Sequence, residues 1–399
     1  MSLQQLKKEI ENFIEVRLSD YQDLALAIHN KPEVSNYEFF ACEVLTNILK
    51  EEGFKVDIDV AGHRTGFAAY YKSNKPGPTL AFLAEYDALV GLGHGCGHNL
   101  FGATSALAGA AIKKVIDQIG GEVIVYGTPG EEGGENGSAK ESFVVEGFFK
   151  NVDAALCVHS ATIHAATPSS LANDPVDIEF WGQASHASGQ PENGINALDA
   201  ILQVYNSLNA LRQHLTDDVR IHGIITHGGD APNTVPDYAS ARFYLRGATR
   251  PTVDALFEKT NNIVKGAALA TGAKGKITKF QNKVDNTIPT PSFDAVYKKH
   301  LESYGETFAP VKNVSMGSTD VGNVSQVIPT IQPYISISDE NINAHSIEFR
   351  DASCSQKGLD SIGLGAKVLA LTALDLYLDS TLLETIKEEH KNLVKAQTK

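Results

Sequence analysis

The fold of this 399-residue chain is constrained most strongly by three short, almost continuously apolar segments, at residues 79–85, 121–126 and 154–158. The first of them reads TLAFLAE, and such a run is typical of a strand that is buried on both faces of a sheet. Helical patterns lie before and between these segments, at 36–52 and 102–118. Buried strands that alternate with helices predict an α/β fold.

Polar side chains gather where these apolar segments end. Glu85 closes the first segment and Asp87 follows it, Glu131 and Glu132 come shortly after the second, and His159 comes directly after the third. Open α/β sheets bind their ligands outside the carboxyl ends of the strands. We therefore expect these side chains to meet at one edge of the sheet. Core packing does not account for so many polar residues at the ends of apolar strands.

The loop that follows the first strand reads GHGCGHN, at residues 93–99. Thiolate, imidazole and carboxylate groups are the side chains that bind zinc and its neighbours in the first transition row. One glycine separates Cys96 from His98, so in an extended stretch both side chains point the same way. His94 is a weaker candidate ligand in the same loop. Adjacent glutamates suit a metal hydrolase, because one can ligate while the other moves a proton.

A different pattern begins near residue 173. Residues 176–181 alternate polar and apolar side chains, which is typical of a half-exposed antiparallel strand. The order expected from there is β-α-β-β-α-β, the ferredoxin-like arrangement. Its later elements are predicted as a helix at 194–214, strands at 220–228 and 238–249, a helix at 252–271 and a strand at 275–284. We therefore expect an inserted domain at 173–286, within a discontinuous domain formed by 1–172 and 287–399.

Composition excludes several classes of partner. The net charge of −14 disfavours nucleic acid and anionic membranes, because both require a concentrated basic surface. The most apolar stretch, 362–378, is interrupted by glycine and charged residues and is interpreted as part of a buried helix at 356–378, with a solvated helical tail at 383–399. The first residues lack the apolar core of a secretion signal. We expect a cytoplasmic protein without a disulfide framework.

The order of the motifs resembles a known family. The pattern is a cysteine–histidine loop, a glutamate pair and two further histidines around an insertion, here Cys96, His98, Glu131, Glu132, His159 and His345. It is similar to the aminoacylase and glutamate-carboxypeptidase clan of di-metal peptidases, and more closely to the branch of hippurate, indole-acetyl-amino-acid and aminobenzoyl-glutamate hydrolases. The strings EYDAL, at 85–89, and GHGCGHNLFG, at 93–102, resemble the subgroup that also contains Xaa-Arg and β-alanyl-lysine dipeptidases. The resemblance covers nearly the whole chain.

This resemblance implies two divalent metal ions per subunit and a role for each matching residue. Glu131 matches the general base and Asp87 an aspartate near the metal centre. Glu85 stands where the wider clan has a histidine ligand, and whether it binds metal stays open, as does the ligand that bridges the two ions. Zinc suits cysteine and histidine ligands, while manganese and cobalt remain alternatives. The residues that match the metal ligands are Cys96, His98, Glu132, His159 and His345.

The inserted domain is implied to serve as a lid and as a dimerisation surface. His186 matches a histidine that stabilises the oxyanion of the reaction, commonly in the active site of the partner subunit. Asn233 matches a residue that holds substrate. Arg250 matches an arginine for a substrate carboxylate, with Arg246 as the alternative. A homodimer is therefore expected.

The predicted activity is hydrolysis of an amide bond in N-acyl amino acids, aminobenzoyl-glutamate or small dipeptides. Metal coordination lowers the pKa of a bound water from about 15.7 to about 7, and Glu131 then removes its proton. The alternative is a non-catalytic metal- or ligand-binding protein that keeps the hydrolase fold. The presence of every expected ligand and of the base disfavours that alternative.

Overall fold

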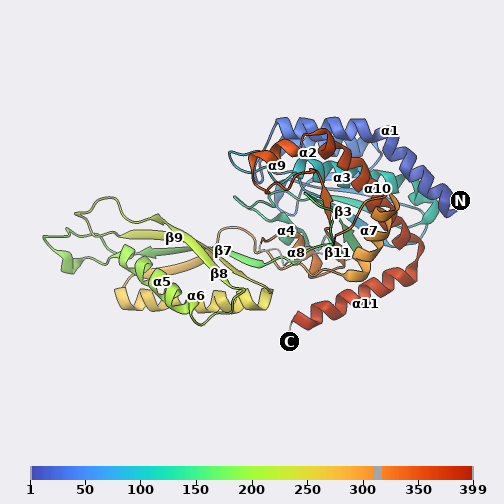
Figure 1. Ribbon diagram of the computed structural model, residues 1–399. Helices are drawn as coiled ribbons and strands as arrows, with labels where there is room; N and C mark the ends of the chain where they lie inside the picture. The colour runs from blue at the N-terminus through green and yellow to red at the C-terminus, as the bar shows by residue number, and fades with distance from the viewer. Residues whose placement is uncertain (1, 310–316, 398–399) are drawn as a thin grey trace. The chain divides into compact units, whose positions relative to one another are not determined.

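The computed structural model describes residues 2–309 and 317–397. It divides the chain into two compact units, each with its own hydrophobic core (Figure 1). The first unit comprises Met1–Ser169 and Thr287–Lys399, and the second comprises Ser170–Asn286.

The first unit is built on a six-stranded mixed sheet in the order β1-β2-β4-β3-β5-β11. Strands β4, β3, β5 and β11 are parallel, while β1 and β2 form an antiparallel edge. The α/β prediction is confirmed, and the three apolar segments form the parallel centre of the sheet. The strands are β1 (Lys55–Val60), β2 (His63–Lys72), β3 (Thr79–Ala84), β4 (Glu122–Gly127), β5 (Ala154–Leu156) and β11 (Thr330–Ile331).

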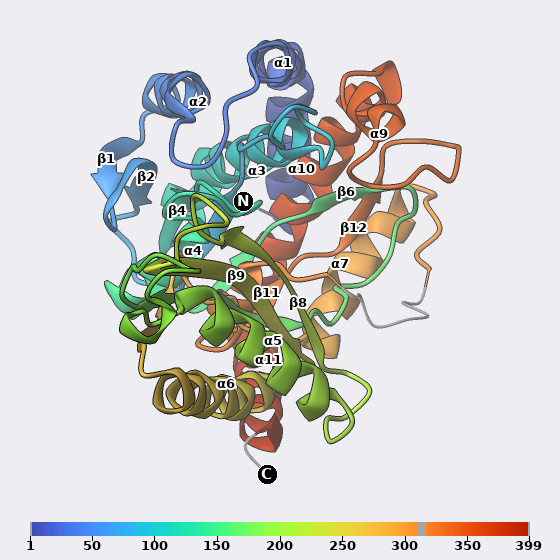
Figure 2. The ribbon, with the colours of Figure 1, turned by 90° about the vertical axis from the view of Figure 1, so that its left-hand side faces the viewer.

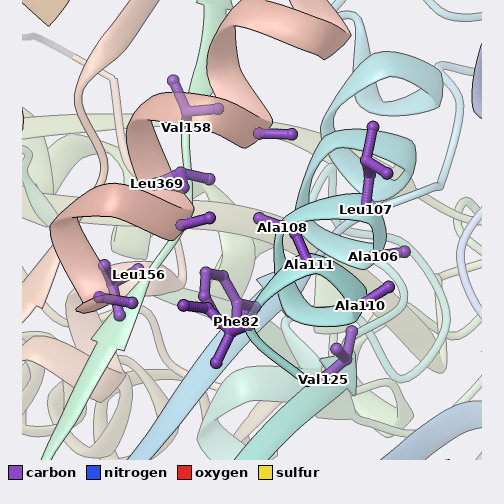
Figure 3. Packing of buried hydrophobic residues seen from close by; sticks show 14 of the residues in the cluster. Phe82, Ala106, Leu107, Ala108, Ala110, Ala111, Val125, Leu156, Val158 and Leu369 are labelled. Atoms are coloured by element: carbon purple, nitrogen blue, oxygen red, sulfur yellow. The ribbon is translucent and has the colours of Figure 1, made fainter. Parts of the chain in front are cut away.

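Three long helices lie side by side in this unit (Figure 2). They are α1 (Leu3–Asn30), α3 (His98–Ile119) and α10 (Gln356–Leu378). Phe82 and Val125 of the sheet pack against small residues of α3 such as Ala108, as Figure 3 shows. Helix α10 is long and apolar enough to cross a membrane, but 78% of its most apolar window is buried inside the fold. It is therefore the core helix that its interrupted apolar pattern predicts.

The remaining elements of the first unit are shorter or peripheral. Helix α11 (Ser380–Gln397) was expected to be solvated, but it buries Leu383, Ile386 and His390. Its apolar residues recur on one face, so that face packs while the charged residues point to solvent. The other elements are α2 (Phe39–Glu51), α4 (Ala139–Val145), β6 (His159–Ala161), α7 (Pro291–Ser303), α8 (Val321–Ser325), β12 (Tyr334–Ser336) and α9 (Ile347–Ala352).

The second unit is a four-stranded antiparallel sheet in the order β10-β7-β9-β8, with α5 and α6 packed against it. This strand order and the β-α-β-β-α-β succession confirm the ferredoxin-like arrangement. Strand β8 lies at the edge of the sheet, and most of its residues are exposed. The elements are β7 (Ala172–Trp181), the short helix η1 (Pro191–Asn193), α5 (Ala197–Arg212), β8 (Arg220–His227), β9 (Tyr238–Gly247), α6 (Arg250–Thr271) and β10 (Lys274–Lys279).

Candidate metal centre

Five of the predicted metal ligands meet in two groups in the first unit. Cys96, His98 and His159 form one group, and Cys96, Glu132 and His345 form the other. Within each group the ligand atoms lie within 4.8 Å of one another. Cys96 belongs to both groups, so its sulfur atom lies near ligand atoms of each.

The distances within the groups are short enough for the side chains to share metal ions. Cys96 Sγ lies 3.5 Å from His159 Nε2, and Glu132 Oε1 lies 3.5 Å from His345 Nε2. His98 Nε2 is buried, and its nearest polar partner is the Glu85 carboxylate, whose Oε2 lies 3.2 Å away. A buried nitrogen lone pair without a donor is costly in a protein interior, and a cation removes that cost. The residues present therefore fit a metal centre.

The backbone at Gly97 explains how Cys96 and His98 are placed. Gly97 has a φ of 77° and precedes helix α3, and a Cβ there would lie 2.6 Å from Ser160 Oγ. His98 is the first residue of α3, so the prediction of an extended stretch and of a helix that begins at residue 102 was wrong. Only glycine tolerates both the left-handed backbone and the close approach. The turn, and not strand alternation, directs the two ligands.

The loop that carries His345 is tied to the same region by its backbone. The His345 amide donates to the carbonyl oxygen of Gly95 at 2.9 Å, and His345 itself has a φ of 62°. Its side chain is 53% exposed, whereas the Cys96 and His98 side chains are buried. One side of the centre is therefore open to solvent.

Asp87 orients two of the ligands. Its Oδ1 accepts a hydrogen bond from His98 Nδ1 at 2.9 Å, and its Oδ2 accepts one from the Glu132 amide at 2.9 Å. This hydrogen bond fixes the orientation of the His98 ring, so that Nε2 faces the candidate centre. Asp87 lies beside the metal ligands, as expected, and acts on them through hydrogen bonds.

The adjacent glutamates experience different environments. Burial, together with the negative charges of Glu85 and Glu132, raises the pKa of Glu131 well above its usual value. Burial would also raise the pKa of Glu132, but the hydrogen bond with His345 and the charge of His98 outweigh it and lower the pKa to about 2. Two carboxyl groups whose pKa values are pushed apart suit one charged ligand and one proton carrier.

Glu85 is also brought to the centre, with partners that the sequence did not reveal. Its Oε2 lies 3.2 Å from His98 Nε2, and its Oε1 lies 2.7 Å from Nζ of Lys140. Lys140 in turn contacts Asp320 at 2.5 Å. Lys140 lies in a glycine-rich region without periodic pattern, so no sequence signal marked it.

His94 lies apart from the ligand groups. It is buried, with its ring centroid 6.1 Å from that of His29, and it belongs to none of the groups of potential ligands among the described residues. We interpret it as a structural residue of the loop.

His186 and Asn233 are neighbours in the second unit. The amide of Ala187 donates to the carbonyl oxygen of Asn233 at 3.0 Å, and both side chains are in exposed positions. His186 Nδ1 accepts a hydrogen bond from the Gly189 amide at 3.1 Å. Its proton is therefore on Nε2, which is the arrangement that a hydrogen-bond donor to an oxyanion requires.

Arg250 is engaged by carboxylates of its own unit. Its guanidinium forms ion pairs with Asp174 and Asp254 at 2.9 Å and with Asp285 at 3.4 Å, and only 11% of its side chain is exposed. These ion pairs involve Nη1 and Nε, while Nη2 is buried without a hydrogen-bond partner in the part of the chain that the structure describes. A role of Arg250 in binding a substrate carboxylate stays a prediction. The alternative, Arg246, donates to His222 Nε2 at 3.2 Å and lies over the ring of Tyr244.

Comparison with known proteins identifies relatives over nearly the whole chain. Residues 175–271 match the family described as the peptidase dimerisation domain, M20_dimer. The chain is 34% identical to the Xaa-Arg dipeptidase of Homo sapiens, over 92% of this chain and 88% of that protein. It is 29% identical to one of the p-aminobenzoyl-glutamate hydrolase subunits of Escherichia coli K12, over 99% of this chain and 97% of that one.

A solved structure agrees with these relatives. A Bacillus subtilis protein described as a dinuclear metal-binding peptidase from the M20 family superposes with a TM-score of 0.63, at 18% identity, over 90% of this chain and 99% of that one. The fold, the inserted ferredoxin-like unit and the identity to the dipeptidase confirm the resemblance that the motifs indicated. The chain belongs to the M20 family of peptidases and amidohydrolases.

Proposed function

We propose that this protein is a metal-dependent amidohydrolase that cleaves the amide bond of dipeptides or N-acyl amino acids with two divalent ions. One observation carries the proposal: Cys96 is shared by two groups of ligand atoms, and Glu131 stands beside them, with its Oε2 3.9 Å from His98 Nε2. Relatives that cleave an Xaa-Arg dipeptide and aminobenzoyl-glutamate support the same reaction.

Each of the chain's own residues at the site has a separate role in the proposed reaction. Bound divalent ions would lower the pKa of a water toward neutrality and polarise the amide carbonyl. Glu131 removes the proton of the attacking water and transfers it to the departing amine nitrogen. Asp87 holds His98 and Glu132 in their orientations. His186 donates from Nε2 to the oxyanion, and Asn233 beside it holds substrate.

Zinc is the ion that this set of donors favours. The proposed ligands are one thiolate, three imidazoles and one carboxylate, and soft or borderline donors of this kind suit zinc better than magnesium or calcium. Manganese and cobalt remain alternatives, because imidazole and carboxylate also bind them.

A hydrolysis screen tests this function. Wild-type protein loaded with zinc, manganese or cobalt is offered dipeptides that end in arginine, lysine or ornithine, aminobenzoyl-glutamate, and N-acyl amino acids. We expect turnover of one class that disappears after chelation and returns when metal is added. A protein that binds two ions and hydrolyses none of these substrates would favour the non-catalytic alternative.

We further propose that the protein is a homodimer that pairs through the second unit. Strand β8 is a sheet edge that exposes Ile224 by 63% and Ile225 by 41%. Natural proteins rarely leave an apolar edge of this kind uncovered, and a two-fold axis lets one copy cover the other. The match of residues 175–271 to a dimerisation domain supports the same surface.

Ile224→Lys is expected to shift the protein from dimer to monomer in sedimentation velocity, because it places a charge in the apolar edge. If His186 acts in the partner's active site, kcat falls as the dimer dissociates. The matched control is Leu269→Lys, which adds the same charge at an 87% exposed position on α6. Wild-type protein that sediments as a fully active monomer would exclude the pairing and the role of His186 in the partner.

A further inference from the structure

A buried series of three charged residues ends at the candidate metal centre. Glu85, Lys140 and Asp320 have fully buried side chains, and Lys140 is the one buried lysine among the residues that the structure describes. Its Nζ lies 2.7 Å from Glu85 Oε1 and 2.5 Å from Asp320 Oδ1. The Lys140 amide also donates to Asp320 Oδ2 at 3.2 Å. Asp320 therefore holds both the backbone and the ammonium group of Lys140.

The two oxygens of Glu85 have different surroundings. Oε1 faces Lys140, whereas Oε2 lies 3.2 Å from His98 Nε2, in a group of potential ligand atoms that also includes Glu131. Glu85 Oε2 and His98 Nε2 are both fully buried, and each is the nearest charged or polar partner that the structure gives the other. Asp87 accepts from His98 Nδ1, so a metal ion that replaces a proton at Nε2 would have that nitrogen and Glu85 Oε2 on either side of it. The geometric observation is that Glu85, His98 and Glu131 offer ligand atoms within 4.8 Å of one another.

Stability does not explain Lys140. Moving a charged group out of water costs several kcal/mol, and a buried ion pair rarely recovers more than that cost. We therefore look for the role of Lys140 in its effect on the Glu85 carboxylate, with which it forms an ion pair. A carboxylate with one oxygen fixed by an ammonium group offers one oxygen to a metal, whereas a free carboxylate can rotate or bind through both.

We propose that Glu85 is an additional metal ligand and that it binds the ion through Oε2 alone. Lys140, which Asp320 holds in place, is the positioning residue: it pairs with Glu85 Oε1 and so keeps that oxygen away from the ion. The inference rests on the metal-dependent function proposed above and adds a ligand to the ion held by His98 and His159.

Metal binding measured in a double-mutant cycle tests the inference. Glu85→Gln, Lys140→Met and the double variant are compared with wild type by metal content after dialysis, by competition with a chromophoric chelator, and by thermal unfolding of the metal-free protein. Each single variant is expected to weaken binding of one of the two ions about 10- to 100-fold, the range that loss of a supporting partner costs. Lys140→Met is expected to add nothing once Glu85 is glutamine, because it acts through Glu85.

The control is Lys367→Met, which removes a lysine from an ion pair with Glu15 at 2.9 Å elsewhere in the first unit and is expected to leave both affinities unchanged. If Lys140→Met does not fold, Asp320→Asn replaces it, since it loosens the anchor and keeps the ammonium group, and it is expected to weaken the same ion.

Three results would overturn the inference. The first is a Glu85→Gln protein that binds both ions with wild-type affinity. The second is a loss from Lys140→Met that persists in the Glu85→Gln background. The third is a Lys140→Met protein whose metal-free form unfolds at a lower temperature while its metal binding is unchanged, which is the result expected if Lys140 is purely structural. Wild-type protein that binds fewer than two ions would overturn the proposed function itself, which the other results leave intact.

Discussion

Glu131→Gln is expected to lower kcat by about 10²- to 10⁴-fold, the usual contribution of a general base, while the protein keeps both metal ions. The side chain is buried beside the ligand groups, and its pKa is raised by burial and by the charges of Glu85 and Glu132. A raised pKa makes the carboxylate a stronger base toward the attacking water. Glutamine has nearly the same shape but cannot move a proton. Stopped assays on protein of verified metal content give the measurement.

The neighbouring glutamate supplies the matched control. Glu132→Gln makes the identical change one residue away, but Glu132 belongs to the group with Cys96 and His345. It is expected to lose the metal on that side, and with it the activity, so the two variants separate proton transfer from metal binding. Near-wild-type turnover by Glu131→Gln would refute the mechanism.

Features that depend on periodicity could be predicted from the sequence. The apolar segments located β3, β4 and β5, and alternation followed by amphipathic patterns located the elements of the second unit. Short helices such as α4 and α8 were missed, because five to seven residues are too few to show a helical period. The start of α3 was misplaced because Gly97 allows a helix to begin directly after a left-handed turn.

The candidate site was predictable where a residue type alone carries the chemistry. Thiol, imidazole and paired carboxylates marked Cys96, His98 and Glu131 from the chain alone. Long-range pairing was not visible: Lys140 meets Glu85 across 55 positions, and Asp320 lies 180 positions beyond Lys140. The ion pairs of Arg250 with Asp174 and Asp285 are of the same long-range kind.

Cys96→Ser is expected to lose both metal ions, whereas a variant of any unshared ligand loses chiefly one. Cys96 belongs to both groups of ligand atoms, while His159 belongs only to the first and His345 only to the second. A serine hydroxyl stays protonated at neutral pH, so it cannot replace a thiolate that two cations share. Loss of a residue that only hydrogen-bonds to a metal ligand weakens metal binding about 10- to 100-fold. The loss of Cys96 should weaken the binding of both ions by more than that.

Metal content by mass spectrometry, with chelator competition, separates the three variants Cys96→Ser, His159→Ala and His345→Ala. The expected pattern is loss of both ions in the first and of one ion in each of the others. His345→Ala should be the milder of the histidine variants, because its side chain is 53% exposed and water can occupy the vacated position. Cys96→Ser protein that retains one tightly bound ion would show that the thiolate serves a single metal and that another residue bridges the pair. Glu85 would not fill that role, since its ligand group includes neither Glu132 nor His345.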